Sequence, residues 1–548
     1  MIDENVDTIL RKAESLESEL NAFKSHWDLT AKYFKPQLDI FTQTPQSPDV
    51  TGFSGLYDTT GIESLDTYSN GMIAEVFSSN EKWMIYTPQD DHEVDDAGRK
   101  WYNKCSELAL TALGRSNFYQ SIKPVVTDMG CGGTGSLYVE RGNKKLLKFC
   151  YDRLGTFAIE KDGEGDIRTE YRWLTMTASE MADKFGEDNL GKKAKASLTD
   201  MKKGGEKTHF TVIHACFPRN KNGIEAKNKP FASIYVCKED RMILEEGGYD
   251  YYPFASPRAE IWNDYNYGLA PASKALPAMR ELNKLRRDVH EGVALQVKPP
   301  WLVPSDSVDE ISTRPNGVTV FDERNGMKPE QMRLYNDINA GMVLMENVTE
   351  QVRGFFHAQL FEAVAQKDKQ MTAREVASIE NAALRRFLPN FNQITTELTP
   401  IFQNVFLLLF NEGVFPDPPE SVKLYPDGPM NAGIVPLPKV EFTSRIALAI
   451  RMIENNAIDR TIERIMPMIQ IAPELADNFD LDQMLRDSAR NDGISEDVIK
   501  NLQQVIEQRE ARAAEMAQQQ QMMMAQQAAS AAKDASQVDP EKLQGMMQ

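Results

Sequence analysis

Residues 384–410 read LRRFLPNFNQITTELTPIFQNVFLLLF and carry the clearest periodic signal in the chain. Apolar side chains recur there at alternating steps of three and four, which is the spacing of one face of an α-helix. The pattern predicts a single helix over residues 372–412, about 60 Å long and kinked at Pro389 and Pro400. The apolar row consists of Leu384, Phe387, Phe391, Ile394, Leu398, Ile401, Val405 and Leu408.

The last part of this helix is apolar almost all round, because Phe402, Phe406, Leu409 and Phe410 lie off the main row. A helix that is apolar on every side has to be buried on several sides. A monomeric domain seldom surrounds so long a helix, so the pattern favours neighbouring subunits around it.

Four further helices are predicted before residue 135. Residues 1–34 place apolar side chains at helical spacing, and Pro36 and the Thr/Pro/Ser-rich stretch 42–51 end the pattern. A second helix is expected over 59–77, weakened by Gly71, and a third and a fourth over about 96–113 and 119–129.

The texture changes after Gly135 to short runs rich in β-branched and aromatic residues, divided by turns such as KDGEG at 161–165. Such runs predict a β-rich domain over residues 135–269. One helix is expected inside it, at 178–185. The Lys/Gly-rich stretch 191–207 is expected to be an exposed loop.

The chain becomes helical again beyond residue 270. Helices are predicted at 270–298, where Lys298-Pro299-Pro300 ends the pattern, and at 336–359, and they enclose a compact insert, 299–335. Residues 443–515 have helical spacing throughout. The stretch 516–532 has no charged residue and is rich in Gln, Met and Ala, for which a helix is favoured over disorder. The fold class is α+β, mainly α.

Composition excludes several classes of protein. The 548 residues carry a formal charge of −19, so a uniformly basic protein that wraps nucleic acid is excluded. Five cysteines without a CxxC pair indicate a reducing compartment and no metal site of the thiolate kind. The acidic N-terminus is unlike a secretion signal, and the longest apolar stretch, 398–411, is shorter than the ~20 residues that cross a bilayer. We therefore expect no membrane association and no cofactor.

Motifs that would indicate an enzyme are incomplete. The GCGGTG at 130–135 matches a dinucleotide fingerprint, but a helix precedes it and a strand follows, so it is interpreted as a turn. The segment 186–193 matches a phosphate loop except that Lys193 stands where a Ser or Thr would bind magnesium. The carboxylates at 90–96 are interpreted as a solvated helix lead-in. His209 and His214 point to opposite faces of a strand and are expected to be packed or hydrogen-bonded.

Opposite charges on the two helices that flank the insert are more informative. Residues 271–298 have a net charge of +3, and residues 337–371 have a net charge of −2. Two interpretations stay open: complementary helices that pack between subunits, or basic groups that face a DNA channel. The residues concerned are Arg280, Lys284, Arg286, Arg287, Glu346 and Glu350.

Six motifs in order resemble the portal proteins, or head-to-tail connectors, of short-tailed (podovirus-type) bacteriophages. Each motif is loose by itself, but their order over nearly the whole chain is specific. They are YDTTGIESLDTYSNGMIAEVFSSNEKW (57–83), GCGGTGSLYVE (130–140), FTVIHACFPRN (210–220), YDYYPFASPRAEIWNDYNYG (249–268), LNKLRRDVHEGVALQVKPPWLVP (282–304) and TAREVASIENAALRRFLPNF (372–391).

The resemblance implies a ring of twelve subunits at one vertex of the capsid, with double-stranded DNA passing along its axis. It divides the chain into named parts, which are expectations. They are a helical part of the wing (1–134), a β-rich wing domain (135–269), two stem helices (270–298 and 336–359), a clip (299–335), a channel loop (360–371), a long wing helix with the following segment (372–442), a helical crown (443–515) and a Gln/Met/Ala-rich tail (516–548).

The same resemblance implies partners and candidate sites. A terminase motor and later tail adaptor proteins are expected at the clip, where Trp301, Leu302 and Val303 are the candidate docking residues. Contact with DNA is expected from the channel loop through Gln366, Lys367, Lys369 and Gln370, which can touch phosphates without reading bases. Major capsid and scaffolding proteins complete the partners. The expected location is the virion, after assembly in the cytoplasm of a bacterial host.

Two other classes of function are weighed against this one. A packaging ATPase or nuclease would need an intact phosphate loop or a scaffolded carboxylate pair, and neither motif is complete. A helical cytoplasmic adaptor without DNA contact would remain a monomer. The sequence therefore predicts a passive channel protein that has no catalytic residues.

Overall fold

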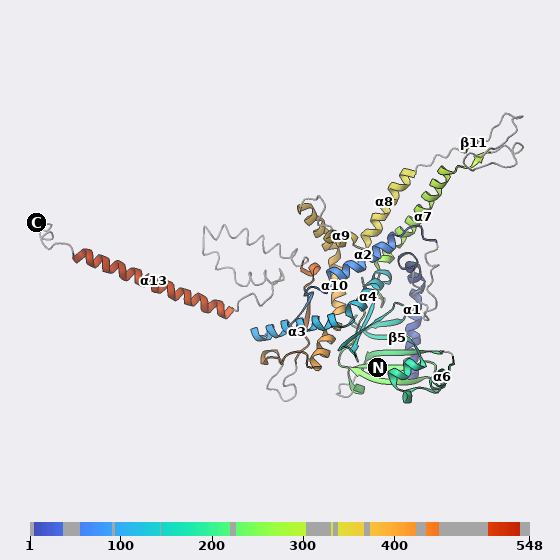
Figure 1. The fold of residues 1–548 in the computed structure, drawn as a ribbon, viewed down its shortest axis with the longest axis horizontal. Coiled ribbons are helices and arrows are strands. Elements are labelled where there is room, and N and C mark those ends of the chain that lie inside the picture. Colours follow the sequence, from blue (N-terminus) through green and yellow to red (C-terminus); the bar gives the residue numbers. More distant parts are fainter. Residues whose placement is uncertain are drawn as a thin grey trace. The chain divides into compact units, whose positions relative to one another are not determined.

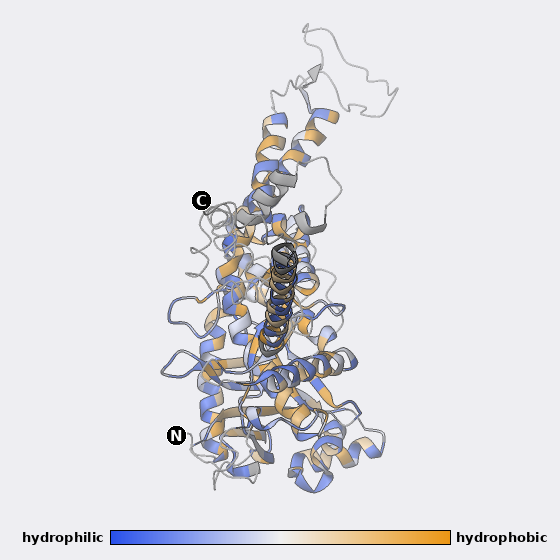
Figure 2. Cartoon of the chain, turned by 90° about the vertical axis from the view of Figure 1, so that its left-hand side faces the viewer, coloured by the Kyte–Doolittle hydropathy of each residue, from blue (hydrophilic) through white to orange (hydrophobic). Residues whose placement is uncertain are grey.

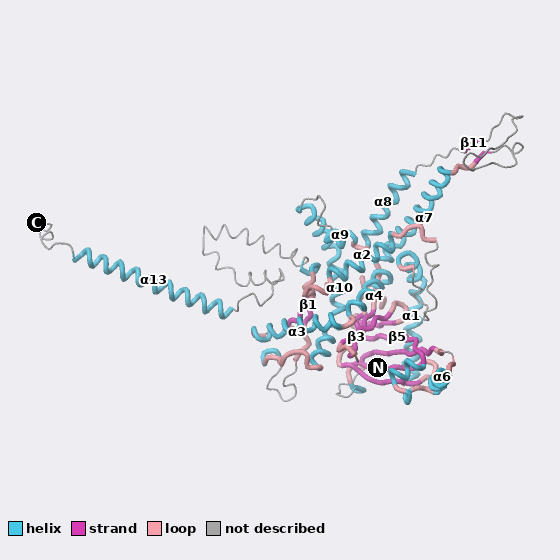
Figure 3. The backbone as a smooth tube through the Cα atoms, viewed as in Figure 1, coloured by secondary structure: helices cyan, strands magenta, loops and turns pink. Residues whose placement is uncertain are grey.

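The computed structural model describes residues 5–36, 55–89, 94–142, 144–205, 207–219, 226–302, 330–331, 338–365, 373–423, 435–448 and 502–536. The chain forms two compact units, one of residues 1–93 and 101–454 and the other of 94–100 and 455–548. Helices and strands both occur in the first unit, and most of the strands gather in one part of it (Figures 1 and 3). The structure is therefore α+β with helices in the majority, as the sequence predicts.

The four predicted N-terminal helices are present. They are α1 (Val6–Phe34), α2 (Thr60–Glu75), α3 (Asp96–Arg115) and α4 (Phe118–Gly132). The apolar row of α1 is buried, and Gly133, in the left-handed region at φ +89°, ends α4. A Cβ at Gly133 would lie 2.0 Å from the carbonyl oxygen of Gly268, so only glycine fits there. Gly133 and Gly135 thus belong to the predicted turn into the β-rich region, whereas Gly130 and Gly132 are still part of α4.

Two antiparallel sheets form this β-rich region. A five-stranded sheet has the order β4-β5-β6-β7-β8, and a three-stranded sheet has the order β3-β2-β9. The strands are β2 (Ser136–Arg141), β3 (Leu147–Asp152), β4 (Phe157–Lys161), β5 (Ile167–Thr177), β6 (His209–Pro218), β7 (Phe231–Cys237), β8 (Met242–Tyr249) and β9 (Phe254–Ala255). His209 is exposed at the start of β6, whereas His214 lies in the part of the strand, 212–217, that is buried on both faces. His214 lies 2.9 Å from Arg172 Nε and 2.9 Å from Ser233 Oγ, so the prediction of a hydrogen-bonded histidine is confirmed for it.

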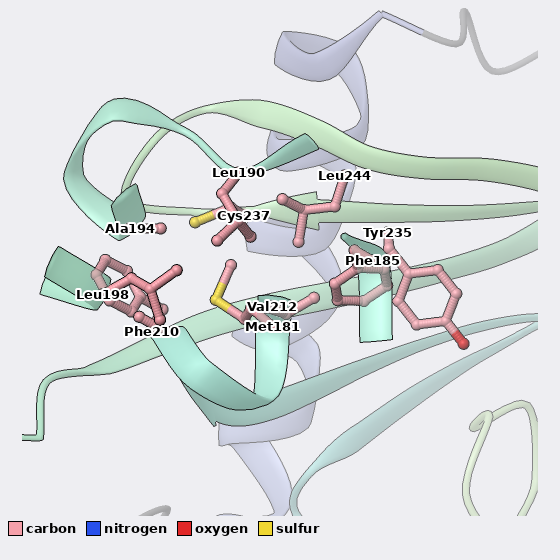
Figure 4. Close-up of a cluster of buried hydrophobic side chains, with 11 residues drawn as sticks. Met181, Phe185, Leu190, Ala194, Leu198, Phe210, Val212, Tyr235, Cys237 and Leu244 are labelled. Carbon is pink, nitrogen blue, oxygen red and sulfur yellow. The ribbon is translucent and has the colours of Figure 1, made fainter. Parts of the chain in front are cut away.

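The exposed loop expected at 191–207 is wrong, because residues Lys192–Lys202 form helix α6. Ala194 and Leu198, one turn apart, are buried with helix α5 (Ala178–Phe185) in a hydrophobic cluster on the sheet (Figure 4). Asp240, from the turn between β7 and β8, accepts the N–H groups of Lys193 and Ala194 at the start of α6. The many lysines made the helical pattern hard to recognise, because only Ala194, Leu198 and the partly buried Met201 form the apolar side of this short helix.

The long predicted helix is confirmed as α10 (Ala373–Asn411), with both prolines inside it. Its apolar end does not need neighbouring subunits, however, because Phe402, Phe406 and Leu409 are buried within the single chain. The rings of Trp83 and Tyr86 lie 5.2 and 5.1 Å from those of Phe402 and Phe406. The expectation of subunit neighbours around this helix therefore loses its support.

Part of this cover comes from a strand pair that the sequence did not predict. Strand β1 (Met84–Thr87) pairs antiparallel with β12 (Lys439–Phe442), which follows α10. A second link reaches α10 from the β-rich region, where Arg258 Nε donates to Glu397 Oε1 at 2.7 Å in a buried ion pair. The long helix α10 thus contacts both the β1–β12 strand pair and the β-rich region.

A helix pair projects from the larger unit (Figure 1). It consists of α7 (Pro271–Val297) and α8 (Ile338–Phe355), and β10 (Trp301–Leu302) pairs with β11 (Glu330–Gln331) just beyond α7. Helix α8 ends earlier than predicted, and α9 (Ala358–Ala365) follows it. Residues 360–365 of the expected channel loop are therefore helical, which corrects the prediction.

In the second unit, α13 (Leu502–Ser536) runs without a break across residue 516, so the helix favoured for the Gln/Met/Ala-rich stretch is confirmed. Its methionines at 516 and 522–524 are more than 60% exposed. The remaining residues of the predicted crown, 449–501, and the carboxylates at 90–93 lie outside the described residues. All five cysteines are described and carry free thiols. None of the helices in the described ranges has the length and apolar character needed to cross a bilayer.

Candidate functional site: the projecting helix pair

Helix α7 is embedded at its start and open further along. Pro271 stands at its first turn, where a missing N–H costs nothing and the fixed φ favours the helix. All buried residues of α7 lie between Pro271 and Leu282. Beyond Leu282, α7 also packs along α8, whose Gly341 would place a Cβ 3.1 Å from Val289. The first half of α7 is therefore an anchor, and the second half projects with α8.

Large apolar side chains remain exposed on the projecting half. Figure 2 shows hydrophobic positions on both helices up to their ends. A single exposed apolar residue is ordinary, but a group of them on neighbouring elements indicates a contact surface. The exposed residues, which we call the stem patch, are Val293, Leu295 and Val297 of α7 and Met342, Val343 and Leu344 of α8, with exposed fractions between 40% and 72%.

Two residues of the predicted clip start the insert. Trp301 and Leu302 form β10, and Trp301 is 39% exposed. Residues 303–329, among them Val303, and residues 332–337 lie outside the described residues. The docking role of Trp301, Leu302 and Val303 thus stays a prediction.

Asn283, in the middle of α7, holds the segment that precedes α2. Its side-chain oxygen accepts the N–H groups of Tyr57 and Asp58 at 2.7 and 3.2 Å, and its amide donates to the carbonyl of Gly55 at 3.2 Å. Arg286, one turn further, donates to Asp58 Oδ2 at 2.8 Å. The other oxygen of the buried Asp58 caps Thr60 N at 2.8 Å, so one carboxylate links α7 to α2.

The charged residues predicted for the helix pair fall into two groups: those with a charged partner in the same chain, and those that are exposed. Arg286 is paired inside its own chain, Arg287 Nε donates to Glu291 at 2.8 Å, and Glu350 lies 3.5 Å from Arg353. Each of these residues has an oppositely charged partner within its own chain, and its assignment to a subunit interface or a channel wall stays a prediction. Arg280, Lys284 and Glu346 are exposed, and their assignment to a subunit interface or a channel wall stays a prediction.

A tight corner connects α8 to α9. His357 lies in the left-handed region at φ +55°, and its ring packs 5.2 Å from that of Phe387 on α10. Burial lowers the pKa of His357 to about 4. Phe361 of α9 rests directly on Gly71, where a Cβ would lie 2.3 Å from the phenyl ring. Gly71 was expected to weaken its helix. Its lack of a side chain is what allows α9 to approach α2.

The four predicted DNA-contact residues of the channel loop, Gln366, Lys367, Lys369 and Gln370, lie outside the described residues. Helix α9 ends at Ala365 and α10 begins at Ala373, so the loop spans at most the seven residues between them. The structure places its two ends and leaves its contacts as a prediction.

The enzyme alternatives find no site among the described residues. At 186–193, Asp240 already accepts the backbone N–H groups of Lys193 and Ala194 that a phosphate would use. The one described group of carboxylates close enough to share a metal ion is Asp162, Glu164 and Asp166, in the turn between β4 and β5. Arg168 pairs with two of them, at 3.1 and 3.4 Å. Arg168 offsets one of the three negative charges, and Asp162 also accepts the backbone N–H groups of Glu164 and Asp166, as is typical of a turn.

Comparisons with known proteins identify the class. The model of a family described as bacteriophage head to tail connecting protein matches residues 6–499. The chain therefore belongs to this family of phage connectors. A probable portal protein of Bordetella phage BPP-1 is 27% identical over 517 residues, which cover 92% of this chain and 90% of that one. The portal protein of Salmonella phage epsilon15 is 24% identical over 527 residues, which cover 94% and 92%. Portal protein is thus the function that these relatives share with the chain.

Two of the solved structures that the chain matches come from gene transfer agent particles. A chain from the virion of a native particle gives a TM-score of 0.35 at 12% identity, covering 77% of this chain and 90% of that one. A chain from the neck of a native particle, computed with C12 symmetry, gives 0.33 at 12% identity, covering 76% and 88%.

Sequence reasoning missed Asp58 and Asn283. Both are ordinary polar residues within longer motifs, and nothing in their spacing connects them. The one available signal was the position of Asp58 before the helical Thr60, which is typical of a cap.

Proposed function

We propose that twelve copies of this chain form a ring at a single vertex of the capsid, with double-stranded DNA passing through the middle. The single observation that carries the proposal is the stem patch. In an isolated chain, six large apolar side chains of two projecting helices would face water, and a contact between copies would cover them. A contact that joins different surfaces of successive copies closes into a ring when the rotation allows it.

In this ring, α7 and α8 form the stem and α10 belongs to the wing. The insert between α7 and α8, which contains β10 and β11, is the clip. The division of the remaining chain into wing, crown and tail follows the ranges given above. The clip offers Trp301 to the packaging motor and later to tail proteins, because aromatic side chains commonly dominate interface energies. Capsid and scaffolding proteins would surround the wing.

DNA would move through the ring without catalysis by this chain. Twelve copies carry a formal charge of about −228, and an acidic surface repels the phosphate backbone, so the DNA slides without adhering. A separate motor, the terminase, would supply the energy. Packaging and ejection would then use the same passive channel in the virion.

The experiment is to measure the mass of the purified chain and of a double variant, Val293→Gln with Leu344→Gln. We expect the wild type to form assemblies of twelve chains and the variant to be mainly monomeric, because two polar groups would then be placed inside each contact. Ile261→Gln is the matched control, since Ile261 is exposed but lies outside the stem patch. Circular dichroism establishes that all variants fold.

A wild type that remains monomeric at micromolar concentration and physiological salt would contradict the ring. Assembly of the double variant equal to that of Ile261→Gln would keep the ring but remove the stem patch from it.

A further inference from the structure

A strongly basic surface covers α6 and the turn that follows it. Residues 192–207 contain six lysines against two carboxylates, a net charge of +4 in a chain whose formal charge is −19. All six lysines are exposed. We call them the lysine surface: Lys192, Lys193, Lys195, Lys202, Lys203 and Lys207.

The lysines follow the outer side of the helix. Ala194, Leu198 and Met201 form the side that packs into the hydrophobic cluster of α5 and the sheet (Figure 4). At 100° per residue, Lys192 and Lys203 lie on the opposite side, and Lys195 and Lys202 lie on one flank between the two sides. This row spans about 17 Å at 1.5 Å per residue.

Stability of the helix does not explain the lysines in its first turn. Lys192 and Lys193 stand in the first turn, where the positive end of the helix dipole disfavours cations. Lys192 and Lys203 form no ion pair with any described residue. Lys202 does pair with Glu187 at 2.7 Å, but both side chains are about 60% exposed, so water screens that pair. The lysine surface therefore carries positive charge that the described residues do not neutralise.

We propose that the lysine surface binds the phosphate backbone of duplex DNA without reading its sequence. Duplex DNA carries one phosphate charge per ~1.7 Å of its axis, so a 17 Å row of cations spans about ten of them. The surface has lysines alone, and residues 191–208 contain no arginine and no aromatic residue. Arginine matches carboxylate and phosphate with a fixed two-pronged geometry, whereas lysine binds phosphate as a flexible point charge, which suits contact that does not read the sequence.

The surface is separate from the projecting helix pair. Figure 1 shows α6 at the end of the larger unit opposite to β11. Binding there is thus a second contact with DNA, outside the proposed channel, and it does not require the ring to be correct.

The test uses relaxed closed-circular duplex DNA, which cannot thread through a ring that is already closed. Binding to the purified assembly is measured from 50 to 300 mM salt for the wild type and for Lys192→Gln with Lys195→Gln and Lys203→Gln. We expect the triple variant to bind at least tenfold more weakly at low salt. The slope of log K against log salt should fall by about 0.9 for each lysine that contacts a phosphate.

The matched control is Lys32→Gln with Lys123→Gln and Lys144→Gln, which removes three exposed positive charges elsewhere. We expect it to bind the circle as the wild type does. Equal binding by the two triple variants would overturn the proposal, as would a wild type that does not bind the circle at 50 mM salt. Binding of labelled polyglutamate but not of the circle would also overturn it, in favour of an acidic protein partner. Loss of the ring with DNA binding retained would instead contradict only the proposed function.

Discussion

At the scale of single residues, Asp58 is the group on which the anchoring of the stem depends. It is buried, it caps α2, and Arg286 of α7 is its cationic partner 228 residues away. We predict that Arg286→Met lowers the free energy of unfolding by about 1–2 kcal/mol, since a carboxylate would stay buried without its partner. The value is at the lower end because the Arg286 side chain is itself 39% exposed. Chemical denaturation of the two proteins measures this difference.

Arg287→Met is the control, because the pair of Arg287 with Glu291 is exposed on both sides. Its effect should lie within about 0.5 kcal/mol of zero. An equal loss for both variants would mean that the pairing of Arg286 with Asp58 does not carry the anchor.

Gly71 gives a second prediction at this scale. Gly71→Ala would press a methyl group against the ring of Phe361, which Tyr68 and Phe387 hold from other sides. We expect a loss of about 1–3 kcal/mol in stability, as for other overpacked sites. Gly114→Ala, in α3, has open space at the same atom and should raise stability by about 0.5–1 kcal/mol. Thermal melts that show the same sign for both variants would contradict this packing.

At the scale of elements, the corner between α8 and α9 should make the fold sensitive to acid. Burial is the largest cause that lowers the pKa of His357 to about 4, against an ordinary value of 6.5. Between these values the unfolded chain binds a proton that the folded chain excludes. Stability should therefore decrease as the pH falls from about 6.5 to 4, by up to ~3 kcal/mol.

Replacing His357 by Asn, which also tolerates a positive φ, should remove this contribution. The measurement is urea denaturation of both proteins at pH 7.5 and pH 4.5. His26 and His214, whose pKa values burial also lowers, are present in both, so the difference between the two pH dependences reports His357. Identical dependences would exclude the corner as an acid-sensitive point.

At the scale of the whole molecule, we predict that the loop between α9 and α10 grips DNA weakly. Lys367→Ala with Lys369→Ala should leave ring formation intact and reduce the DNA that filled particles retain. The reduction should be larger at low salt, because two cations per chain contribute a salt-dependent contact. Packaging and retention are measured across a range of salt. Normal values throughout would remove the loop from the mechanism.

Elements whose signal is local could be predicted from the order of the residues. The row from Leu384 to Leu408 specified α10, and the switch from helical to alternating spacing after Gly135 marked the β-rich region. Residues 271–297 and 338–355 were recognisable as a helix pair around an insert for the same reason. Such periodicities follow from backbone geometry, which repeats within a few residues.

Only the tertiary structure decided which distant segments meet. From its sequence, the apolar end of α10 was expected to contact other subunits. In the folded chain, β1 and β12, which pair across more than 350 residues, lie beside it. From its sequence, Arg286 was a candidate for contact with a neighbouring subunit or a channel. In the folded chain, its Nε donates to Asp58 Oδ2 at 2.8 Å. Spacing along the chain records which way a side chain faces on its own element, but the free energy of burial depends on whatever segment covers that face.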